Sequence, residues 1–354
     1  MKILITGGAG FVGSNLAKYF RHEFPQSQIT AFDNLKRRGS ELNLKDFRDQ
    51  KINFVHGDIR NRCDFDSLEG NFDLLIEASA EPSVLAGLGG SPHYLLDTNL
   101  GGTINCLEFA RSRVERTIFL STSRVYSIEA LRSVPLVETE SRLVLKGPFE
   151  HMGLTEQGIT EDFDVLKARS LYGASKLASE FMCQEYHNAY GSRVLINRCG
   201  VIAGAGQFGK VDQGVFTLWV AHHVFGKSLS YTGFGGQGKQ VRDLLHPHDL
   251  FQLILKQMEH TPAFQAEVFN VGGGLAGSVS LRELTGICQA VTGKDVAIGS
   301  NPQTNPVDIP FYISDNAKVE ARFGWKAQRR PKDIVLDISN WINENKVALK
   351  GIFA

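Results

Sequence analysis

The first fourteen residues constrain the fold more than any other part of the chain. Lys2–Thr6 is a short apolar run typical of a buried β-strand. It leads directly into three glycines at G-x-x-G-x-x-G spacing, Gly7, Gly10 and Gly13. Backbone without Cβ atoms lets main-chain N–H groups approach a pyrophosphate, and a helix starting near Phe11 would direct its positive end at the same phosphates. This stretch therefore predicts the start of a dinucleotide-binding fold.

An acidic residue follows at the distance expected for binding the adenosine ribose. Asp33 ends a second apolar segment, about twenty residues beyond the glycine turn. Lys36–Arg38 is a compact basic cluster close by, and it can be either a solvated loop or a site for the 2′-phosphate of NADP. Because a carboxylate at the ribose repels that phosphate, Asp33 favours NAD as the cofactor.

Apolar segments alternate with amphipathic ones through about the first 200 residues. This alternation predicts an α/β fold with a doubly wound parallel Rossmann sheet, covered on both faces and binding ligands at the carboxyl ends of its strands. The expected strands are Lys2–Thr6, Ile29–Asp33, Ile52–His56, Leu74–Glu77, Thr117–Thr122 and Arg193–Arg198. The expected helices include Ser14–Arg21, Asn99–Arg111 and Ser170–Tyr190.

The alternation stops near residue 199, where glycine-rich and aromatic stretches such as Gly204–Gly214 begin. They predict a smaller, discontinuous C-terminal substrate lobe, because Val268–Val271 resembles a strand that returns to the main sheet. The expected NAD-binding domain covers 1–199 plus roughly 240–275. The lobe then covers 200–239 and 276–354.

Composition argues against several classes of partner. Lys+Arg and Asp+Glu both number 38 and no long basic run occurs, which argues against nucleic acid and anionic membranes. The chain shows no signal-peptide pattern and no apolar run long enough to span a bilayer. Five scattered cysteines without C-x-x-C spacing predict reduced thiols rather than disulfides or a metal site. We expect a soluble cytoplasmic protein without a bound metal.

The second informative motif is Tyr172-x-x-x-Lys176. Its spacing places both side chains on one face of the helix expected at Ser170–Tyr190. A lysine cation and a positively charged nicotinamide both favour the phenolate form of tyrosine, which makes it a usable base. The same lysine can hydrogen-bond the nicotinamide ribose. The alternative is an ordinary surface pair, which the preceding dinucleotide motif disfavours.

Hydroxyl groups at the end of the strand Thr117–Thr122 can complete a catalytic site. Thr122 is expected to hydrogen-bond the substrate oxygen that is oxidised, with Ser123 as an auxiliary catalytic group. Ordinary capping of the strand end by these side chains is the alternative.

These motifs, together with Gly57-Asp-Ile-Arg60 and Asn99-Leu-Gly-Gly-Thr103, resemble the extended short-chain dehydrogenases/reductases over nearly the whole chain. The fourth strand of that family usually ends in His-Leu-Ala-Ala, whereas this chain has Glu77-Ala-Ser-Ala80. The resemblance implies that NAD is bound by Gly7, Gly10, Phe11, Val12, Gly13, Asp33, Asn34, Asp58, Ile59, Ala78, Ser79, Ala80, Asn99, Tyr172 and Lys176.

Members of that family act mostly on nucleotide sugars. The 4,6-dehydratases carry an acidic pair directly after the active-site threonine, and Ser123-Arg124 at those positions argues against elimination of water. Val211-Asp-Gln-Gly214, Gly238-Lys-Gln-Val-Arg-Asp243 and the insertion between Ser141 and Leu171 resemble the CDP-paratose 2-epimerases, also called CDP-tyvelose epimerases. The substrate-binding residues implied are Thr122, Gln207, Asp212, Gln213, Arg242 and Asp308.

Arg242 suits a diphosphate because a planar guanidinium binds phosphate oxygens in pairs. A structural ion pair with Asp243 or Asp249 is the alternative. Two departures leave the head group and the sugar open. Val201 stands where relatives often carry a polar phosphate-contacting residue, and Asn305 stands near the position of an expected arginine.

The resemblance predicts an NAD-dependent nucleotide-sugar epimerase that inverts C2 of CDP-paratose through a transient keto sugar, giving CDP-tyvelose. A UDP-hexose 4-epimerase and a nucleotide-sugar reductase or dehydrogenase remain open. A non-catalytic dinucleotide sensor is disfavoured by the intact Tyr172–Lys176 pair. Apolar faces on Asn99–Arg111 and Ser170–Tyr190 predict a homodimer or homotetramer, with burial against the protein's own core as the alternative.

Overall fold

The computed structural model describes residues 1–209 and 214–353, and the chain divides into two compact units. Unit 1 comprises Met1–Val125, Ser170–Arg198 and Phe251–Phe269. Unit 2 comprises Tyr126–Arg169, Cys199–Leu250 and Asn270–Ala354. These boundaries differ from those expected, since 126–169, 240–250 and 270–275 fall in unit 2. The first of these segments contains Ile159, which bridges to Ser314 of the same unit, a long-range pairing that the local sequence pattern does not indicate.

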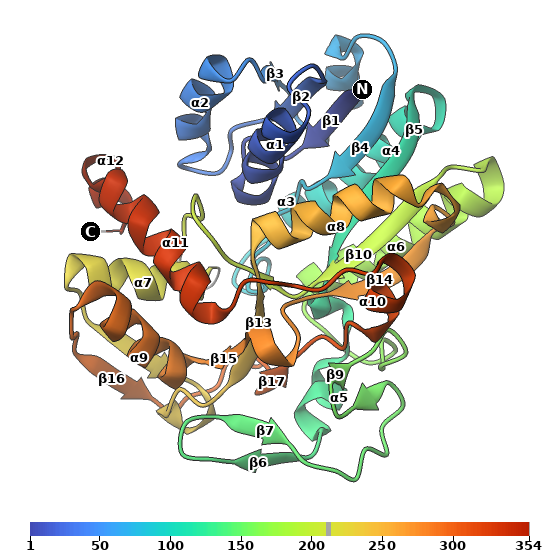
Figure 1. Ribbon diagram of the computed structural model, residues 1–354. Coiled ribbons are helices and arrows are strands. Elements are labelled where there is room, and N and C mark those ends of the chain that lie inside the picture. The colour runs from blue at the N-terminus through green and yellow to red at the C-terminus, as the bar shows by residue number, and fades with distance from the viewer. Residues whose placement is uncertain (210–213, 354) are drawn as a thin grey trace. The chain divides into compact units, whose positions relative to one another are not determined.

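Unit 1 is built on a seven-stranded sheet with the order β14-β10-β5-β4-β1-β2-β3 (Figure 1). Pairing is parallel from β3 through β5, and the chain order reverses direction at β1. The structure therefore confirms a doubly wound parallel Rossmann sheet. The strands are β1 (Lys2–Thr6), β2 (Gln28–Asp33), β3 (Asn53–His56), β4 (Phe72–Glu77), β5 (Val114–Thr122), β10 (Val194–Cys199) and β14 (Glu267–Val271).

The strands form where the sequence is apolar on both faces. Ile3, Leu4 and Ile5 in β1 have no exposed surface, as expected for a central strand between two helix layers. Each expected strand is present, and β14 confirms the segment that returns to the main sheet. The largest shift is in β5, which begins at Val114 rather than Thr117.

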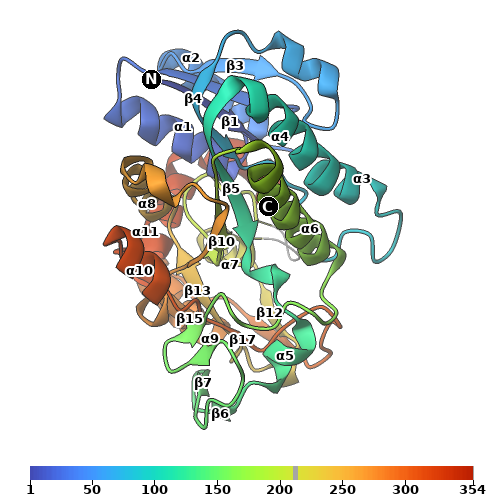
Figure 2. The same ribbon diagram turned by 90° about the vertical axis from the view of Figure 1, so that its right-hand side faces the viewer.

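Helices cover both faces of this sheet, with α1 and α8 on one side and α4 and α6 on the other (Figure 2). The helix expected at Asn99–Arg111 consists of two pieces, a π-helical turn at Asp97–Gly101 followed by α4. The helices are α1 (Phe11–Glu23), α2 (Asn43–Asp49), α3 (His93–Leu96), α4 (Gly102–Arg113), α6 (Leu171–Tyr190) and α8 (Pro247–Glu259). Short 3-10 helices lie at Ser40–Leu42, Arg62–Ser67, Ser123–Val125 and Thr261–Ala263.

Unit 2 combines small sheets with helices. Its four-stranded sheet has the order β11-β13-β15, with β17 also pairing with β13. Its strands are β6 (Leu136–Glu138), β7 (Leu143–Leu145), β8 (Leu154–Thr155), β9 (Gly158–Ile159), β11 (Val201–Ile202), β12 (Leu229–Thr232), β13 (Val241–Leu245), β15 (Ser278–Ser280), β16 (Ile298–Asn301) and β17 (Phe311–Tyr312). Its helices are α5 (Ile128–Ser133), α7 (Val215–Phe225), α9 (Leu281–Thr292), α10 (Ala317–Phe323), α11 (Pro331–Glu344) and α12 (Lys346–Phe353), with 3-10 helices at Phe234–Gly236 and Leu275–Gly277.

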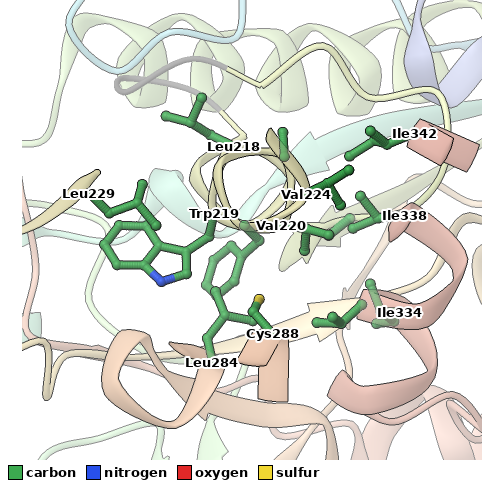
Figure 3. Packing of buried hydrophobic residues seen from close by; sticks show 14 of the residues in the cluster. Leu218, Trp219, Val220, Val224, Leu229, Leu284, Cys288, Ile334, Ile338 and Ile342 are labelled. Atoms are coloured by element: carbon green, nitrogen blue, oxygen red, sulfur yellow. The ribbon is translucent and has the colours of Figure 1, made fainter. Parts of the chain in front are cut away.

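The core of unit 2 forms where α7, α9 and α11 meet (Figure 3). The α7 helix is apolar on all sides and buries most of its side chains, as expected of a helix enclosed by other elements. Trp219 on α7 stacks on Tyr231 with ring centroids 5.6 Å apart, and its Nε1–H donates to Thr285 Oγ1 at 2.9 Å. The apolar ring of this indole is therefore buried and its N–H group has a hydrogen-bond acceptor.

Among the residues that the structure describes, none of the helices combines the length and the apolar character that crossing a membrane requires.

Candidate active site

The glycine turn after β1 leads directly into the start of α1. Gly7 adopts a φ of 64°, and the Gly10 N–H donates to the Gly7 carbonyl at 3.0 Å. A Cβ on Gly13 would collide with that carbonyl, so the turn can close only with glycine there. Gly10 caps α1 without a side-chain hydrogen bond, and the first turn, Phe11 and Val12 included, holds no acidic residue. The positive end of α1 therefore suits a dinucleotide pyrophosphate.

The carboxylate of Asp33 lies at the end of β2 and is bound by main-chain N–H groups. It accepts hydrogen bonds from Ala9 at 3.1 Å and from Leu35 at 2.7 Å. Burial raises the pKa of Asp33, and these hydrogen bonds offset part of that effect. The structure thus connects the acidic residue expected at the ribose to the glycine turn, which contains Ala9.

Asn34 and Asp58, both expected to bind the cofactor, contact each other directly. Asn34 Nδ2 donates to Asp58 Oδ2 at 2.9 Å, and Arg60 Nη2 donates to the same oxygen at 2.6 Å. Burial raises the pKa of Asp58, but the hydrogen bonds from Arg60 and Asn34 outweigh burial and lower that pKa to about 2. The Asp58 carboxylate therefore stays ionised at neutral pH.

Ile59, the neighbour of Asp58, is buried and lies so close to Gly102 that a Cβ on Gly102 would collide with it.

Tyr94 belongs to the same region, although nothing in the sequence indicated it. Lys36 Nζ lies 5.2 Å from the centroid of the Tyr94 ring, and Arg60 Cζ lies 4.7 Å from it. Lys36, the first residue of the basic cluster, therefore packs on an aromatic face. The contact depends on how the chain returns from β2 to α3, which a local pattern does not encode.

The end of β4 lies against the glycine turn. The Ala78 N–H donates to the Thr6 carbonyl at 3.2 Å. A Cβ on Gly7 would lie 2.8 Å from both the Ala78 carbonyl oxygen and the Ser79 nitrogen. Ser79 is buried, whereas Ala78 and Ala80 are half-buried. The structure therefore places Ala78 and Ser79 beside the turn with which they were expected to bind NAD.

Asn99 is fully buried in the π-helical turn, and its side chain binds protein groups. Its Nδ2 donates to the Glu81 carbonyl and to Ser175 Oγ, both at 3.1 Å, and its Oδ1 accepts the Glu81 N–H at 2.8 Å. Asn99 thus connects the loop after β4 to α6. A contact of Asn99 with the cofactor stays a prediction.

Tyr172 and Lys176 lie one turn apart on α6, as their spacing predicts. Ser170 caps this helix by accepting the Gly173 N–H at 3.1 Å, which fixes the first turn that carries Tyr172. Tyr172 is half-buried, whereas Lys176 is 1% exposed and its Nζ lies 3.9 Å from the centroid of the Phe119 ring on β5. An enclosed ammonium of this kind favours the phenolate form of a neighbouring tyrosine.

The two catalytic hydroxyl candidates lie where β5 ends. The α6 helix packs against β5 and against the 3-10 helix Ser123–Val125. Thr122 Oγ1 accepts the Arg124 N–H at 3.2 Å, so strand-end capping does occur, and the Thr122 O–H can still donate. Thr122 and Ser123 are both buried. The structure therefore brings their strand end against the helix that carries Tyr172 and Lys176.

A buried ion pair that was not identified from the sequence lies on the same helix. Glu180 follows Lys176 by one further turn and accepts hydrogen bonds from Arg198 on β10, through Nε at 3.1 Å and Nη2 at 2.8 Å. Ser121 Oγ, next to Thr122, also donates to Glu180. The pair attaches α6 to two strands of the sheet. Repetition of the four-residue spacing from Tyr172 through Glu180 is the signal that could have indicated it.

Glu77 is the second buried carboxyl group without an assigned role. Its side chain is 1% exposed at the end of β4, where Thr103 Oγ1 donates to Oε2 at 3.1 Å. Oε1 has no hydrogen-bond partner among the described residues. Burial raises the pKa of Glu77 to about 7, although Lys176 and the bond from Thr103 lower it. Only its departure from the family's usual strand end marked this residue in the sequence.

In unit 2, Arg242 on β13 forms an ion pair with Asp308. Arg242 Nη2 donates to Asp308 Oδ1 at 2.9 Å and to the Ile309 carbonyl at 2.6 Å. The acidic residues considered as alternatives bind other groups: Asp243 accepts main-chain N–H groups of Gly274 and Ser314, and Asp249 pairs with Arg329. The structure therefore brings together two of the residues expected to bind substrate.

Three further residues expected to bind substrate are Gln207, Asp212 and Gln213, and the structure describes only Gln207. Thr217 Oγ1 donates to Gln207 Oε1 at 2.5 Å, and Gln207 Nε2 donates to the Ile202 carbonyl at 3.1 Å. The Gln207 amide thus braces the start of α7. Asp212 and Gln213 lie outside the described residues.

An arginine absent from the sequence-based list supports the loop around Asn305. Arg132 on α5 donates through Nη2 to the carbonyls of Asn305 at 3.0 Å and Asp308 at 2.8 Å. This arginine orders the loop that carries Asp308, the partner of Arg242. Val201 is half-buried against the core of unit 2 and supplies no polar contact.

Comparison with known proteins identifies the family of this site. Residues 3–272 match the NAD dependent epimerase/dehydratase family. The chain is 29% identical to the CDP-paratose 2-epimerase of Salmonella typhi, over 96% of this chain and 99% of that protein. It is 26% identical to a dTDP-glucose 4,6-dehydratase of Streptomyces antibioticus, over 98% of this chain and 93% of that protein.

The fold is shared with solved structures. A UDP-glucuronic acid 4-epimerase from Bacillus cereus, in complex with UDP-glucuronic acid and NAD, superimposes with a TM-score of 0.78. That comparison covers 97% of this chain and 99% of the other, at 20% identity. Because the family match spans most of the chain, the protein belongs to the NAD dependent epimerase/dehydratase family.

Proposed function

We propose that this enzyme inverts C2 of CDP-paratose to give CDP-tyvelose, with Tyr172 as the base. The observation that carries the proposal is the half-buried Tyr172 one turn from the enclosed Lys176 ammonium, on a helix packed against Thr122 and Ser123. Identity to a CDP-paratose 2-epimerase over nearly the full length supports the choice of substrate. The absence of an acidic pair at Ser123-Arg124 disfavours a dehydratase.

Each residue of the site has a defined task in this reaction. Tyr172, as phenolate, removes the proton of the C2 hydroxyl, and the Thr122 O–H steadies the sugar oxygen. NAD, when bound, would supply a reversible acceptor for the C2 hydride, and the keto sugar would turn in the pocket so that it takes the hydride back on its other face, with no net oxidation. Lys176 keeps Tyr172 ionised and holds the nicotinamide ribose. Tyr172 finally returns the proton to the inverted alcohol.

Unit 2 supplies a candidate diphosphate contact. Arg242 presents a guanidinium whose Nη2 is bound to Asp308 and to a carbonyl group. Asp308 is itself held in place by the bonds that Arg132 makes to its loop. We infer that Arg242 binds the substrate diphosphate and that Asp308 sets the orientation of this guanidinium.

The helices α4 and α6 also carry features that support self-association as a homodimer or homotetramer. Phe181 and Tyr190 on α6 are 51% and 56% exposed. Arg111 on α4 lies over the Tyr190 ring at 4.9 Å, and Tyr186 donates to Glu108 at 2.6 Å. Exposed aromatic groups of this kind, rimmed by charges, are typical of interfaces.

The five free cysteines support a reducing compartment such as the cytoplasm.

A UDP-hexose 4-epimerase is the second candidate, since the chain is 26% identical to the UDP-glucose 4-epimerase of Pisum sativum over 99% of its length. Proton NMR of the purified protein with CDP-paratose, UDP-glucose or UDP-glucuronic acid distinguishes the two. We expect only CDP-paratose to convert to its C2 epimer. Conversion of a UDP-hexose with CDP-paratose left unchanged would exclude the proposed substrate.

Mass spectrometry of the protein as purified gives a cofactor readout that needs no substrate. We expect near-stoichiometric NAD among the small molecules released by acid, because an epimerase that recycles its cofactor need not release it. NADP that washes out freely would instead favour a reductase.

A further inference from the structure

Glu77 is a buried carboxyl group to which the proposed mechanism gives no task. It ends β4, its side chain is 1% exposed, and its Oε1 has no hydrogen-bond partner in the described part of the chain. An unpaired buried carboxylate destabilises a protein, so its presence needs a reason beyond packing. Among the described residues, the hydrogen bond that this carboxyl group accepts comes from Thr103 on α4.

The position of Glu77 relative to Lys176 follows from the sheet register. Glu77 pairs with Phe119 on β5, and the Lys176 Nζ lies 3.9 Å from the centroid of the Phe119 ring. Adjacent strands lie about 4.8 Å apart, and register partners point to the same face. That face is covered by α4 and α6, because Glu77 is bonded to α4 and Phe119 packs against Cys183 of α6. The Glu77 carboxyl and the Lys176 ammonium therefore share one buried layer.

In the part of the chain that the structure describes, few other titratable groups lie near this carboxyl group. Thr6 of β1 is its register partner on the other side. Cys106 of α4 and Cys183 of α6 also face it, and burial raises the pKa of both thiols, so they stay neutral. The next acid along α6, Glu180, is paired with Arg198. Lys176 is thus the cation that acts on Glu77. Its charge lowers the pKa of Glu77, in agreement with this geometry.

We propose that Glu77 is a positioning residue, whose carboxylate acts through Lys176 by sharing the buried layer of the ammonium and offsetting part of the field that the ammonium exerts on Tyr172. The inference rests on the proposed function, in which Tyr172 is the base. An ionised Glu77 makes the Tyr172 phenolate harder to form, and a protonated Glu77 makes it easier. The ionisation state of Glu77 thereby influences the pH range in which Tyr172 is ionised and can act as the base.

Titration of Tyr172 tests this inference without any substrate. The near-ultraviolet absorbance of tyrosinate is followed against pH for the protein with its NAD, and the curve of the matching Tyr172→Phe variant is subtracted. In Glu77→Gln, which keeps an acceptor for Thr103, we expect the Tyr172 midpoint to fall by about one pH unit, because removal of a buried negative charge makes the phenolate easier to form. Glu77→Asp, which restores the charge, should recover most of the shift.

Glu115→Gln is the matched charge control. Glu115 is the second residue of β5, at the opposite end of that strand from Thr122, and its side chain is half-exposed. Its Tyr172 midpoint should equal that of the unmodified protein. A folded, NAD-binding Glu77→Gln protein with an unchanged Tyr172 midpoint would overturn the inference. A Tyr172 that titrates only near the ordinary tyrosine pKa in every variant would instead overturn the proposed phenolate.

A second measurement needs no substitution at Glu77, in case Glu77→Gln does not fold. NMR of protein labelled with 13C at tyrosine Cζ reports Tyr172 directly, and its signal is assigned by its loss in Tyr172→Phe. Two coupled groups titrate together, so we expect the Tyr172 signal to show an extra inflection near the Glu77 pKa of about 7. A Tyr172 curve without that inflection would also refute the coupling.

Discussion

Tyr172 and Lys176 acquire their chemistry from what encloses them. The spacing of the pair is encoded locally, but the Phe119 ring beneath the ammonium and the buried Glu77 come from strands β5 and β4. Removing the phenol oxygen removes the proposed base, whereas the glycine turn and Asp33, which are also expected to bind NAD, are unchanged.

For Tyr172→Phe we therefore expect retained NAD and a turnover lower by a factor of about 10²–10⁴, the usual contribution of a general base. Steady-state kinetics together with acid release of the cofactor measures both. Tyr190→Phe is the matched control, because Tyr190 is the last residue of the same helix and is exposed. Near-full activity of Tyr172→Phe would remove the phenolate from the mechanism.

The Glu180–Arg198 pair determines how firmly α6 is attached to the sheet. Both side chains are buried, so loss of one partner leaves an unpaired buried charge. We expect Arg198→Met to lower the free energy of unfolding by about 3–5 kcal/mol, as measured by urea denaturation.

Arg193→Met provides the comparison for this prediction. Arg193 lies just before β10 and pairs with Glu115 at 3.5 Å, with both side chains about half-exposed. Exposed pairs contribute about 0–1 kcal/mol, so this variant should remain close to the unmodified protein. Equal losses in the two variants would show that burial of the pair is not what stabilises α6.

The α6 helix begins immediately before Tyr172, the proposed base. Ser170 is the N-cap, and Tyr172 lies in the first turn, so the cap decides the direction in which the phenol is presented. The opposite end has a different device, since Gly191 ends the helix with a φ of 70°. We therefore expect activity to depend on the N-terminal end of α6 more than on its C-terminal end.

We expect Ser170→Ala to destabilise the protein by about 0.5–2 kcal/mol, because the Gly173 N–H loses its acceptor. Turnover should fall by more than NAD binding does, because Tyr172 shifts while the glycine turn does not. Ser170→Thr keeps a hydroxyl cap and should restore both quantities. Thermal unfolding and steady-state kinetics on the two variants decide the matter, and an inactive but fully stable Ser170→Thr would contradict this account.

For the whole molecule, the exposed aromatic groups on α6 bear on assembly. Phe181→Lys places a charge at the proposed contact between copies, so we expect the dimer to dissociate in sedimentation velocity runs. Leu336→Lys is the control, because Leu336 on α11 of unit 2 is similarly exposed, at 48% against 51% for Phe181. A monomeric unmodified protein, or a Phe181→Lys protein that stays dimeric, would refute the proposed interface.

Much of the architecture can be read from local sequence. Apolar strands such as Lys2–Thr6 and the glycine turn specify the Rossmann sheet, because each pattern satisfies its backbone requirement within a few residues. The membership of 126–169 in unit 2 could not be read in this way. It depends on pairings such as that of Ile159 with Ser314, which are far apart in the chain.

The candidate site divides along the same line. Spacing within one helix identifies Tyr172 and Lys176, and strand-to-helix patterns place Asp33 and the glycines, because i,i+4 geometry and tight turns are local properties. The partners that tune those groups, Glu77 and Arg198 among them, become neighbours only when β4, β5 and β10 assemble beneath α4 and α6. Burial and charge pairing are properties of the assembled layers. They therefore determine the ionisation of these side chains and the stability of α6 against the sheet, for which periodicity in a single sequence carries no signal.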